Sequence, residues 1–205
     1  KGIRWQNKPP LNGRELTADD VVFSLRRQWE VGYQSRTYRY LSDMANVANS
    51  IYVSPTDEWA VVVKCQPLQA GQVTNAAPTA MTHIIAPETL ADYKKANSDW
   101  KKIIGTGPFI LQDYVGASSL TWVRNPDYWG YDPFFPENKL PYLDTFKILI
   151  IPDISTQLAG IRTGKIDNLS FLKSEEVESL LNTNPELLSV HGNVSVNVIS
   201  PRNDT

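Results

Sequence analysis

The sequence predicts an α/β protein in which short helices alternate with strands and turn-rich loops. Apolar residues recur at helical spacing from Ala18 to Val31, which indicates one amphipathic helix. Runs of β-branched and aromatic residues flank polar turns, as hairpins require. An apolar run from Thr145 to Ile151 is followed by a short helical pattern and a strand pattern ending at Phe171. This strand–helix–strand order is typical of α/β folds.

Composition narrows the class of protein. The chain has 205 residues, of which 41% are hydrophobic and 20% charged, as expected for one or two globular domains. Its 20 basic and 22 acidic residues give a net charge of −2, so we expect no nucleic-acid partner. No apolar run approaches the roughly 20 residues of a membrane helix. A single cysteine, Cys65, excludes an internal disulfide and fits either a reducing compartment or a secreted protein without crosslinks.

The first helix is predicted to begin after Thr17, whose side chain suits the N-cap position. Asp19 and Asp20 then lie in the first turn, where the helix dipole favours negative charge. We interpret the two carboxylates as helix-start residues and not as a catalytic pair. The reason is that no histidine or other pairing partner lies nearby in the sequence.

Gly32 is predicted to end this helix, and three tyrosines and two arginines follow between residues 33 and 40. Such a loop either presents rings and guanidinium groups to a ligand or covers the neighbouring helix. Beyond it, the runs Ser50 to Val53 and Trp59 to Lys64 predict a hairpin. Cys65 follows as a small buried residue, without the histidine that a nucleophile would need.

Two further helices are predicted, one from Ala86 to Leu90 with Pro87 at its first position and one from Ser98 to Ile103. His83 precedes them without histidine, cysteine or carboxylate companions at metal-ligand spacing. We therefore expect no metal site.

The segment Gly105-Thr106-Gly107-Pro108 predicts a turn, because glycine tolerates positive φ and proline fixes its own φ. Two strands, Phe109 to Leu111 and Leu120 to Val123, are expected to flank a polar tip. Asn125 then suits the N-cap of a helix with Pro126 at its first position.

The strand Thr145 to Ile151 is predicted to be buried on both faces, because it is apolar throughout. Asp153 or Ser155 begins the next helix, Gly164 ends it, and a strand runs from Ile166 to Phe171. A short helix between two strands favours a parallel, right-handed connection.

The end of the chain continues the alternation of helix and strand. A helix opens at Ser174, with three glutamates near its N-terminus. Residues 187 to 199 then predict one or two strands, because valines alternate with polar residues there.

The sequence lacks the motifs that common classes of enzyme require. Gly164-Lys165 is followed by Ile166 and therefore does not form a phosphate-binding loop. No nucleophile-elbow motif is present. A glycosidase-like enzyme would need two converging carboxylates, for which Asp153, Asp167 and Glu175 are the candidates. We prefer a non-enzymatic function with no catalytic residues and keep the glycosidase as an alternative.

Four motifs occur in the order in which one known family has them. They are Gly2-Ile3-Arg4-Trp5, Leu16 to Ser24, Ile103 to Phe109 followed by Arg124 to Trp129, and Leu158 to Asp167. The chain thereby resembles the family 5 extracellular solute-binding proteins of ABC transporters, which include oligopeptide, dipeptide and nickel receptors. The resemblance implies a periplasmic binding protein-like fold of type II, cluster C, of which this chain is an internal fragment. Residues 1–104 would be part of the family's extra α/β domain and residues 105–205 part of ligand-binding lobe I, with the second lobe absent.

Ligand contacts are expected at strand ends, where open α/β sheets bind their ligands. The resemblance supports the segment after Asp167 and the last strand, and it adds a tyrosine from the loop after the first helix. The candidate ligand-binding residues are Tyr38, Ser170, Phe171, Asn193, Ser195 and Asn197. Ordinary strand packing is the alternative for each of them.

The resemblance also implies a function, namely binding of a solute for import. We expect an oligopeptide, captured by closure of two lobes and delivered to an ABC transporter permease in the membrane. A nickel complex, haem or a sugar is the alternative ligand for a receptor of the same fold. We expect a monomer without cofactors, in the periplasm or outside the cell, either free or anchored as a lipoprotein. The signal segment of such a protein is not in this chain.

Overall fold

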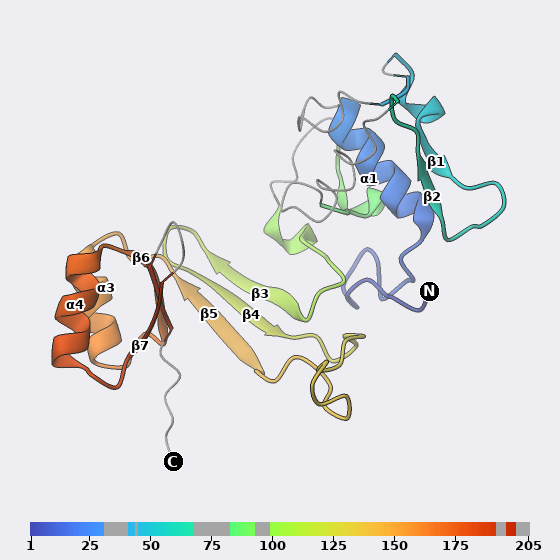
Figure 1. Cartoon of the computed structure of the whole chain (residues 1–205). Coiled ribbons are helices and arrows are strands. Elements are labelled where there is room, and N and C mark those ends of the chain that lie inside the picture. The colour runs from blue at the N-terminus through green and yellow to red at the C-terminus, as the bar shows by residue number, and fades with distance from the viewer. Residues whose placement is uncertain (31–40, 44, 68–82, 93–98, 192–195, 200–205) are drawn as a thin grey trace. The chain divides into compact units, whose positions relative to one another are not determined.

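The structure is a computed structural model of the whole chain (Figure 1). It describes residues 1–30, 41–43, 45–67, 83–92, 99–191 and 196–199. The chain divides into two compact units, Lys1–Ile148 (unit 1) and Leu149–Thr205 (unit 2), and each is described by itself. None of the described helices is long and apolar enough to cross a membrane.

Unit 1 begins its core with the predicted helix, which is α1, Ala18–Glu30. This helix packs on a hairpin of β1, Ile51–Val53, and β2, Val61–Val63 (Figure 1). The two strands pair antiparallel, as the sequence predicted. Cys65 lies just beyond β2 and is half-buried, and this burial raises the pKa of its thiol. The buried hydrophobic residues of this core are Val22, Leu41, Val47 and Ile51.

The segment before α1 packs against residues near the middle of the chain. The Gln6 backbone N–H donates to the Gly105 carbonyl at 2.9 Å, and its side-chain amide donates to the Phe109 carbonyl at 2.7 Å. A second hydrophobic cluster lies beneath this junction, because apolar side chains from three separate segments meet there. Its buried members are Trp5, Leu11, Ala86 and Ile104.

Three short 3-10 helices connect these parts, namely η2, Val47–Asn49, η3, Pro87–Thr89, and η4, Trp100–Lys102. The prediction of a longer helix from residue 86 to residue 90 is wrong, because Leu90 already has extended backbone with ψ 128°. The predicted helix after residue 98 is likewise only η4. Its N-cap is Asp99, whose side chain accepts a hydrogen bond from a backbone N–H of η4 at 3.0 Å.

A three-stranded sheet completes unit 1. β3, Phe109–Val115, and β4, Ser119–Arg124, form the predicted hairpin, and β5, Thr145–Leu149, pairs on the β4 side. The predicted polar tip is shorter than expected, because residues 113–115 continue the strand. The chain reverses at residues 116–118, where Ala117 has a positive φ of 55°.

The prediction that Asn125 begins a helix is wrong. Its buried side-chain amide donates to the Gly107 carbonyl at 3.1 Å, and its oxygen accepts from the Asp127 N–H at 3.1 Å. A further N–H, that of Tyr128, donates to the Asn125 carbonyl at 3.2 Å and closes a single turn. The asparagine therefore fastens this turn to the Gly-Thr-Gly-Pro segment and does not cap a helix.

The prediction that the strand from residue 145 is buried on both faces is also wrong in this chain. β5 lies at the edge of its sheet, where one row of its backbone groups has no strand beside it within the described residues. Ile148 is 47% exposed, and Leu149 is 46% exposed. Hydropathy alone could not distinguish a buried central strand from an apolar edge strand.

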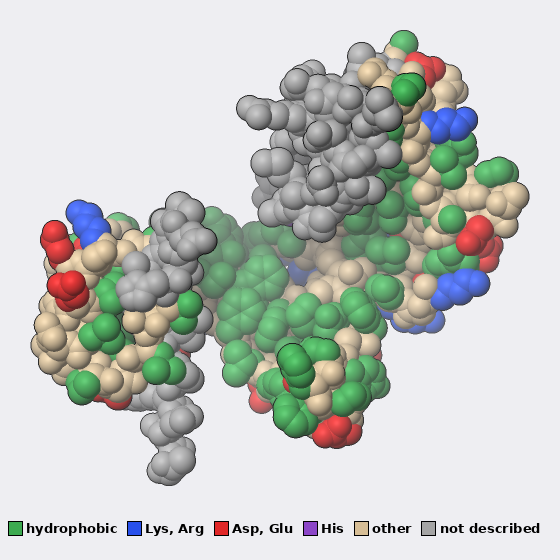
Figure 2. Space-filling view, viewed as in Figure 1, with side chains coloured by type: hydrophobic (Ala, Val, Ile, Leu, Met, Phe, Trp, Pro, Cys, Tyr) green, Lys and Arg blue, Asp and Glu red, His purple; other side chains and the backbone are tan. Residues whose placement is uncertain are grey.

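The loop between β4 and β5 carries a group of exposed hydrophobic side chains (Figure 2). Polar contacts within the loop fix its shape, since the Asp132 carboxylate accepts from the Phe134 N–H at 2.7 Å and from the Tyr142 hydroxyl at 2.7 Å. The Tyr142 hydrogen bond lowers the pKa of the Asp132 carboxyl. The exposed residues of the loop are Trp129, Tyr131, Phe134, Phe135, Tyr142 and Leu143.

Unit 2 packs two helices against a three-stranded sheet (Figure 1). Its strands have the order β6-β8-β7, with both neighbouring pairs antiparallel. The elements are α3, Ile154–Arg162, β6, Asn168–Leu172, α4, Ser174–Thr183, β7, Leu188–His191, and β8, Val196–Ile199. The buried core residues are Ile161, Leu172, Val177, Leu180 and Leu187.

Local signals at the ends of α3 are confirmed. The Asp153 carboxylate caps the helix by accepting a hydrogen bond from the Thr156 N–H at 2.7 Å. Gly164 follows the helix with φ 64°, a conformation that glycine adopts without a steric penalty. The chain can therefore turn after α3 and enter β6 at Asn168.

The predicted parallel connection through α3 is not formed. β5 and β6 belong to different sheets, and β6 pairs antiparallel with β8 instead. The alternation of residues 187–199 did predict the β7 and β8 strands. The proposed boundary between the extra domain and lobe I, at residues 104 and 105, concerns membership of the family's lobes and stays a prediction. The two compact units divide at residue 148.

Candidate functional site

The strongest candidate for ligand contact is the irregular end of β6. Ser170 lies opposite Asn197 of β8, whereas Leu172 lies opposite Val196, so the pairing skips one residue of β6. This is a β-bulge with Phe171 as the extra residue. Bulges are frequent beside binding sites, because they redirect one side chain without ending the strand.

The bulge turns Phe171 away from the core. Regular alternation would put its ring on the same face as Leu169, which packs against the core of unit 2. The bulge gives that place to Leu172, which is only 5% exposed, whereas Phe171 is 82% exposed. Phe171 also has φ 65°, the left-handed region that a bulky residue rarely adopts. The chain therefore maintains an unfavourable backbone conformation and an exposed aromatic ring at one residue.

Of the other predicted contact residues, Ser170 and Asn197 belong to the part of the chain that the structure describes. The backbones of Ser170 and Asn197 face each other across β6 and β8, so two of the predicted positions are neighbours. The Ser170 hydroxyl lies 3.3 Å from the side-chain oxygen of Asn168. Three candidates, Tyr38, Asn193 and Ser195, lie outside the described residues.

The carboxylates considered for an enzyme have other surroundings. Asp153 accepts hydrogen bonds from the Thr156 hydroxyl and N–H, and these lower the pKa of its carboxyl. A general acid at neutral pH needs the opposite shift. Asp167 and Glu175 are exposed. Within the described ranges, no group of three or more histidine, cysteine, aspartate or glutamate residues could hold a metal ion.

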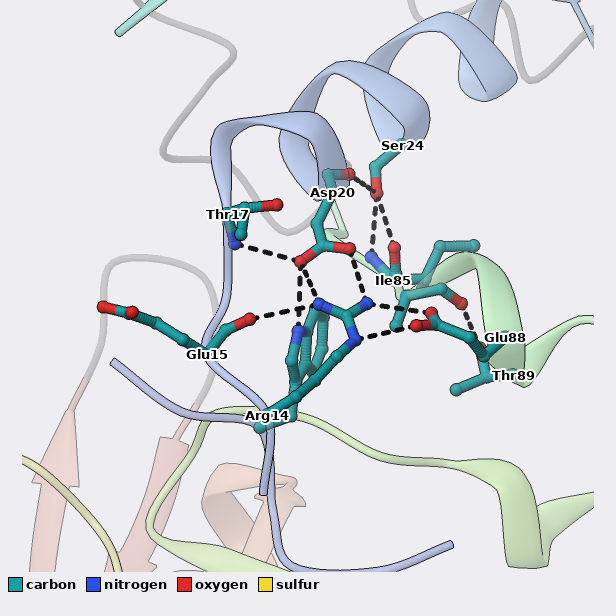
Figure 3. A network of polar contacts seen from close by, with 10 residues as sticks. Arg14, Glu15, Thr17, Asp20, Ser24, Ile85, Glu88 and Thr89 are labelled. Atoms are coloured by element: carbon teal, nitrogen blue, oxygen red, sulfur yellow. Dashed lines mark hydrogen bonds and ion pairs between the residues drawn. The ribbon is translucent and has the colours of Figure 1, made fainter. Parts of the chain in front are cut away.

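A polar network in unit 1 joins Arg14 to two residues of the N-terminal motifs, Trp5 and Asp20 (Figure 3). The Arg14 guanidinium donates to both oxygens of Asp20, at 2.8 and 2.7 Å, and to both oxygens of Glu88, at 2.7 and 2.8 Å. The Asp20 carboxylate also accepts from the Trp5 indole N–H at 3.2 Å and from the Thr17 N–H at 3.0 Å.

This network is structural. Asp20 is buried within the first turn of α1, and its bond to the Thr17 N–H is half of a capping box. Arg14 uses its guanidinium donors on two carboxylates and on the Glu15 carbonyl, so it has no donor left for a ligand. The prediction that Asp20 is a helix-start carboxylate is confirmed, but its charge is buried and paired. The long-range partner Glu88 was not predictable from spacing.

We expect unit 1 to lose stability in acid. Burial alone would raise the pKa of the Asp20 carboxyl, but hydrogen bonds from Arg14, Thr17 and Trp5 outweigh it and lower this pKa. Arg14 also lowers the pKa of Glu88. Since both pKa values are lower in the folded chain, their stabilising contribution is complete above the unfolded-state values near pH 4. It is lost as the pH falls through the folded-state values.

Urea unfolding between pH 7 and pH 2, followed by tryptophan fluorescence, measures this dependence. All six tryptophans belong to unit 1, so the signal reports on that unit alone. Asp20→Asn should flatten the pH dependence, whereas the exposed neighbour variant Asp19→Asn should leave it unchanged. Equal slopes in wild type and Asp20→Asn would contradict the prediction.

Comparisons with known proteins agree with the fold and the motif order. The model of the bacterial extracellular solute-binding proteins, family 5 Middle, matches residues 1–203. The oligopeptide-binding protein AppA of Bacillus subtilis is 28% identical over 174 residues, covering 82% of this chain and 28% of AppA. The haem-binding protein A of Haemophilus influenzae is 27% identical over 183 residues, covering 83% of this chain and 31% of that protein.

A solved structure gives the same result for the fold. The structure of Bacillus subtilis AppA in complex with a nonapeptide matches with a TM-score of 0.66 and 24% identity. The match covers 93% of this chain and 34% of the AppA chain, so this chain spans about a third of the length of its relatives. The fold is therefore that of part of a periplasmic binding protein. The chain belongs to the bacterial extracellular solute-binding proteins, family 5.

Proposed function

We propose that this chain is part of a receptor that captures peptides for import by an ABC transporter. The single observation that supports this most is the exposed ring of Phe171, which a β-bulge holds in a left-handed conformation. An exposed aromatic ring on a rigid strand offers apolar contact area at little cost in side-chain entropy. Within the described residues β6 is itself an edge strand of its sheet, so its outer backbone groups offer hydrogen bonds, which recognise a peptide irrespective of its sequence.

The name of a relative also supports a peptide ligand, since AppA of Bacillus subtilis is described as an oligopeptide-binding protein. In the proposed mechanism the ligand is enclosed when a second lobe closes on this one, and a membrane permease then receives it. The described residues would supply apolar contact and hydrogen bonds, and no bond in the ligand would be broken. The proposed location is the periplasm or the cell exterior, where a receptor meets its solute before import.

A ligand other than a peptide is the second candidate, because the relative from Haemophilus influenzae is named a haem-binding protein. An exposed aromatic ring would also stack on a flat macrocycle. Mass spectrometry distinguishes the two ligand classes. The protein is purified under native conditions with the sequence that flanks these residues in its own gene, and the ligand is released by denaturation. Peptides in the released fraction would support the proposal, and haem alone would overturn it.

Two variants of Phe171 test its role in binding. Phe171→Ala removes the ring but keeps a side chain in the left-handed conformation, whereas Phe171→Gly removes the ring and relieves the backbone. We expect both to weaken binding of a synthetic nonapeptide library by about tenfold or more. The bound peptide would cover the ring, and burying a phenylalanine side chain contributes roughly 1.5–3 kcal/mol. We expect Phe171→Gly alone to stabilise unit 2, by about 1 kcal/mol.

The measurements are peptide retention by mass spectrometry and amide hydrogen exchange of α3 and α4. A matched control is Leu188→Ala, which removes another exposed apolar side chain of the same sheet. Wild-type retention by both Phe171 variants would contradict the proposed contact. A loss of retention caused only by unfolding would appear as lost protection, which Phe171→Gly is not expected to show.

A further inference from the structure

Unit 1 contains a cavity whose lining residues are remote in sequence from β6. It has a volume of about 440 Å³ and is open to solvent. This volume lies in the range of small-molecule sites, which is roughly 300–1,000 Å³. Ile110 of β3 and Val123 of β4 lie opposite each other in the hairpin and both line the cavity, so its floor is apolar. The Trp100 ring of η4 supplies an aromatic wall.

Two ammonium groups stand beside this aromatic wall. The Lys8 Nζ lies 5.7 Å from the centre of the Trp100 ring, and the Lys101 Nζ lies 5.9 Å from it. The ring is also fixed by an edge-to-face contact with Tyr114, at 6.4 Å between ring centres. The cavity thus combines an apolar floor, a positioned indole ring and two positive charges.

The charge of Lys8 is only partly compensated. Its Nζ donates to the Leu111 carbonyl at 3.3 Å, which is a neutral acceptor. Burial lowers the pKa of the Lys8 ammonium, and the nearby charge of Asp99 acts in the opposite direction. Lys8 is partly buried. A partly buried ammonium whose hydrogen-bonded partner is neutral gains from an added anion, because ion pairing offsets its lost hydration.

The strand beside Lys8 is irregular. The pairing of β3 with β4 shifts between Leu111 and Asp113, which makes Gln112 an extra residue. Gln112 lines the same cavity. As at β6, a bulge places a side chain where regular alternation would not.

We propose that this cavity binds a small amphipathic carboxylate. The apolar body of the ligand would rest on Ile110, Val123 and the Trp100 ring, and its carboxylate would lie beside the ammonium groups of Lys8 and Lys101. A carboxylate fits better than a phosphate. Phosphate sites commonly use a concave group of backbone N–H donors, whereas the described lining of this cavity offers two ammonium groups, which match one compact anion. This site is independent of the proposed peptide contact at β6, so either can fail alone.

Three probes with one apolar body and different head groups test the proposal. They are 4-phenylbutyrate, 4-phenylbutan-1-ol and 4-phenylbutylamine, each titrated into the ¹⁵N-labelled chain. The readout is the indole N–H resonance of Trp100, assigned with Trp100→Phe. We expect 4-phenylbutyrate to bind with a Kd of about 1 mM, as is ordinary for a ligand of this size. The alcohol should bind about tenfold more weakly, and the amine should not bind.

Lysine variants identify the charge that selects the carboxylate. Lys8→Met keeps the apolar stem and should remove the preference for 4-phenylbutyrate over the alcohol, whereas Lys8→Arg should retain it. The matched control is Lys64→Met, which removes another lysine that lies over an aromatic ring, Tyr52 at 5.1 Å. It should change neither affinity nor preference.

Several results would overturn this site. They are equal affinity for the acid and the alcohol, a preference that survives in Lys8→Met, or no shift of the Trp100 resonance up to about ten times the expected Kd. If Lys8 only supports the strand, Lys8→Met will lower the urea midpoint of unit 1 while leaving the preference for the acid intact. That outcome also contradicts the proposal.

Discussion

Replacing Leu180 with alanine is expected to unfold most of unit 2 while unit 1 stays folded. Leu180 is completely buried in α4, at the centre of the cluster formed with Ile161, Leu172 and Val177. Removing three heavy atoms from such a position costs about 2–5 kcal/mol, because the cavity is only partly filled by relaxation. A unit of this size has a total stability of only about 3–8 kcal/mol. The variant should therefore lose most or all of its native population.

The loss is measured by amide hydrogen exchange of α3 and α4 in the whole chain, together with far-ultraviolet circular dichroism. Tryptophan fluorescence should not change, since every tryptophan lies in unit 1. Leu188→Ala is the matched control, because it makes the same leucine-to-alanine change at a residue that is 56% exposed. This change should lower the free energy of unfolding by less than about 0.5 kcal/mol. Undiminished protection in Leu180→Ala would show that this cluster does not hold unit 2 together.

Replacing Asp20 with alanine is expected to destabilise unit 1 by about 3 kcal/mol. The change leaves the Trp5 indole N–H and the Thr17 N–H without their acceptor, and it removes one of the two carboxylates that bind Arg14. Breaking a buried ion pair commonly costs about 3–5 kcal/mol. The lower end applies here, because the Arg14 side chain is 31% exposed and keeps its ion pair with Glu88.

Urea unfolding followed by tryptophan fluorescence gives the free energy of unfolding of unit 1. Asp19→Ala is the control, since Asp19 occupies the preceding position of the same helical turn but is exposed. Its loss should change the free energy of unfolding by less than about 0.5 kcal/mol. If Asp20→Ala and Asp19→Ala gave equal midpoints, the network would contribute nothing beyond a helix-terminal charge.

Local sequence patterns predicted the elements whose physical cause is local. The helix after Thr17, the hairpin around residue 57, the Asp153 cap and the Gly164 reversal all depend on residues within a few positions of one another. The alternating valines of β8 likewise predicted its strand. These signals arise from backbone geometry and side-chain period, which short segments carry in full.

The errors arose where distant residues decide the outcome. Asn125 has every local feature of a helix start, but its side chain binds the Gly107 carbonyl, 18 positions earlier. The strands flanking α3 have the local features of a parallel unit, yet β6 pairs with β8, which follows it by more than 20 residues. The place of Phe171 at the end of a predicted strand, together with the family resemblance, predicts it as a contact residue. The bulge that turns it outward, and the Lys8 cavity, depend on strand register, which the pattern of one strand does not determine.

The contacts of Gln6 have a consequence for the making of this protein. Its two acceptors are the carbonyls of Gly105 and Phe109, about a hundred positions later in the chain. A ribosome that adds roughly 5–20 residues each second needs about 5–20 s to cover that interval. During synthesis, the segment around Gln6 therefore stays in contact with water or a chaperone until its partners leave the exit tunnel. Unit 1 cannot complete its fold before that moment, because these contacts join residues far apart in the sequence.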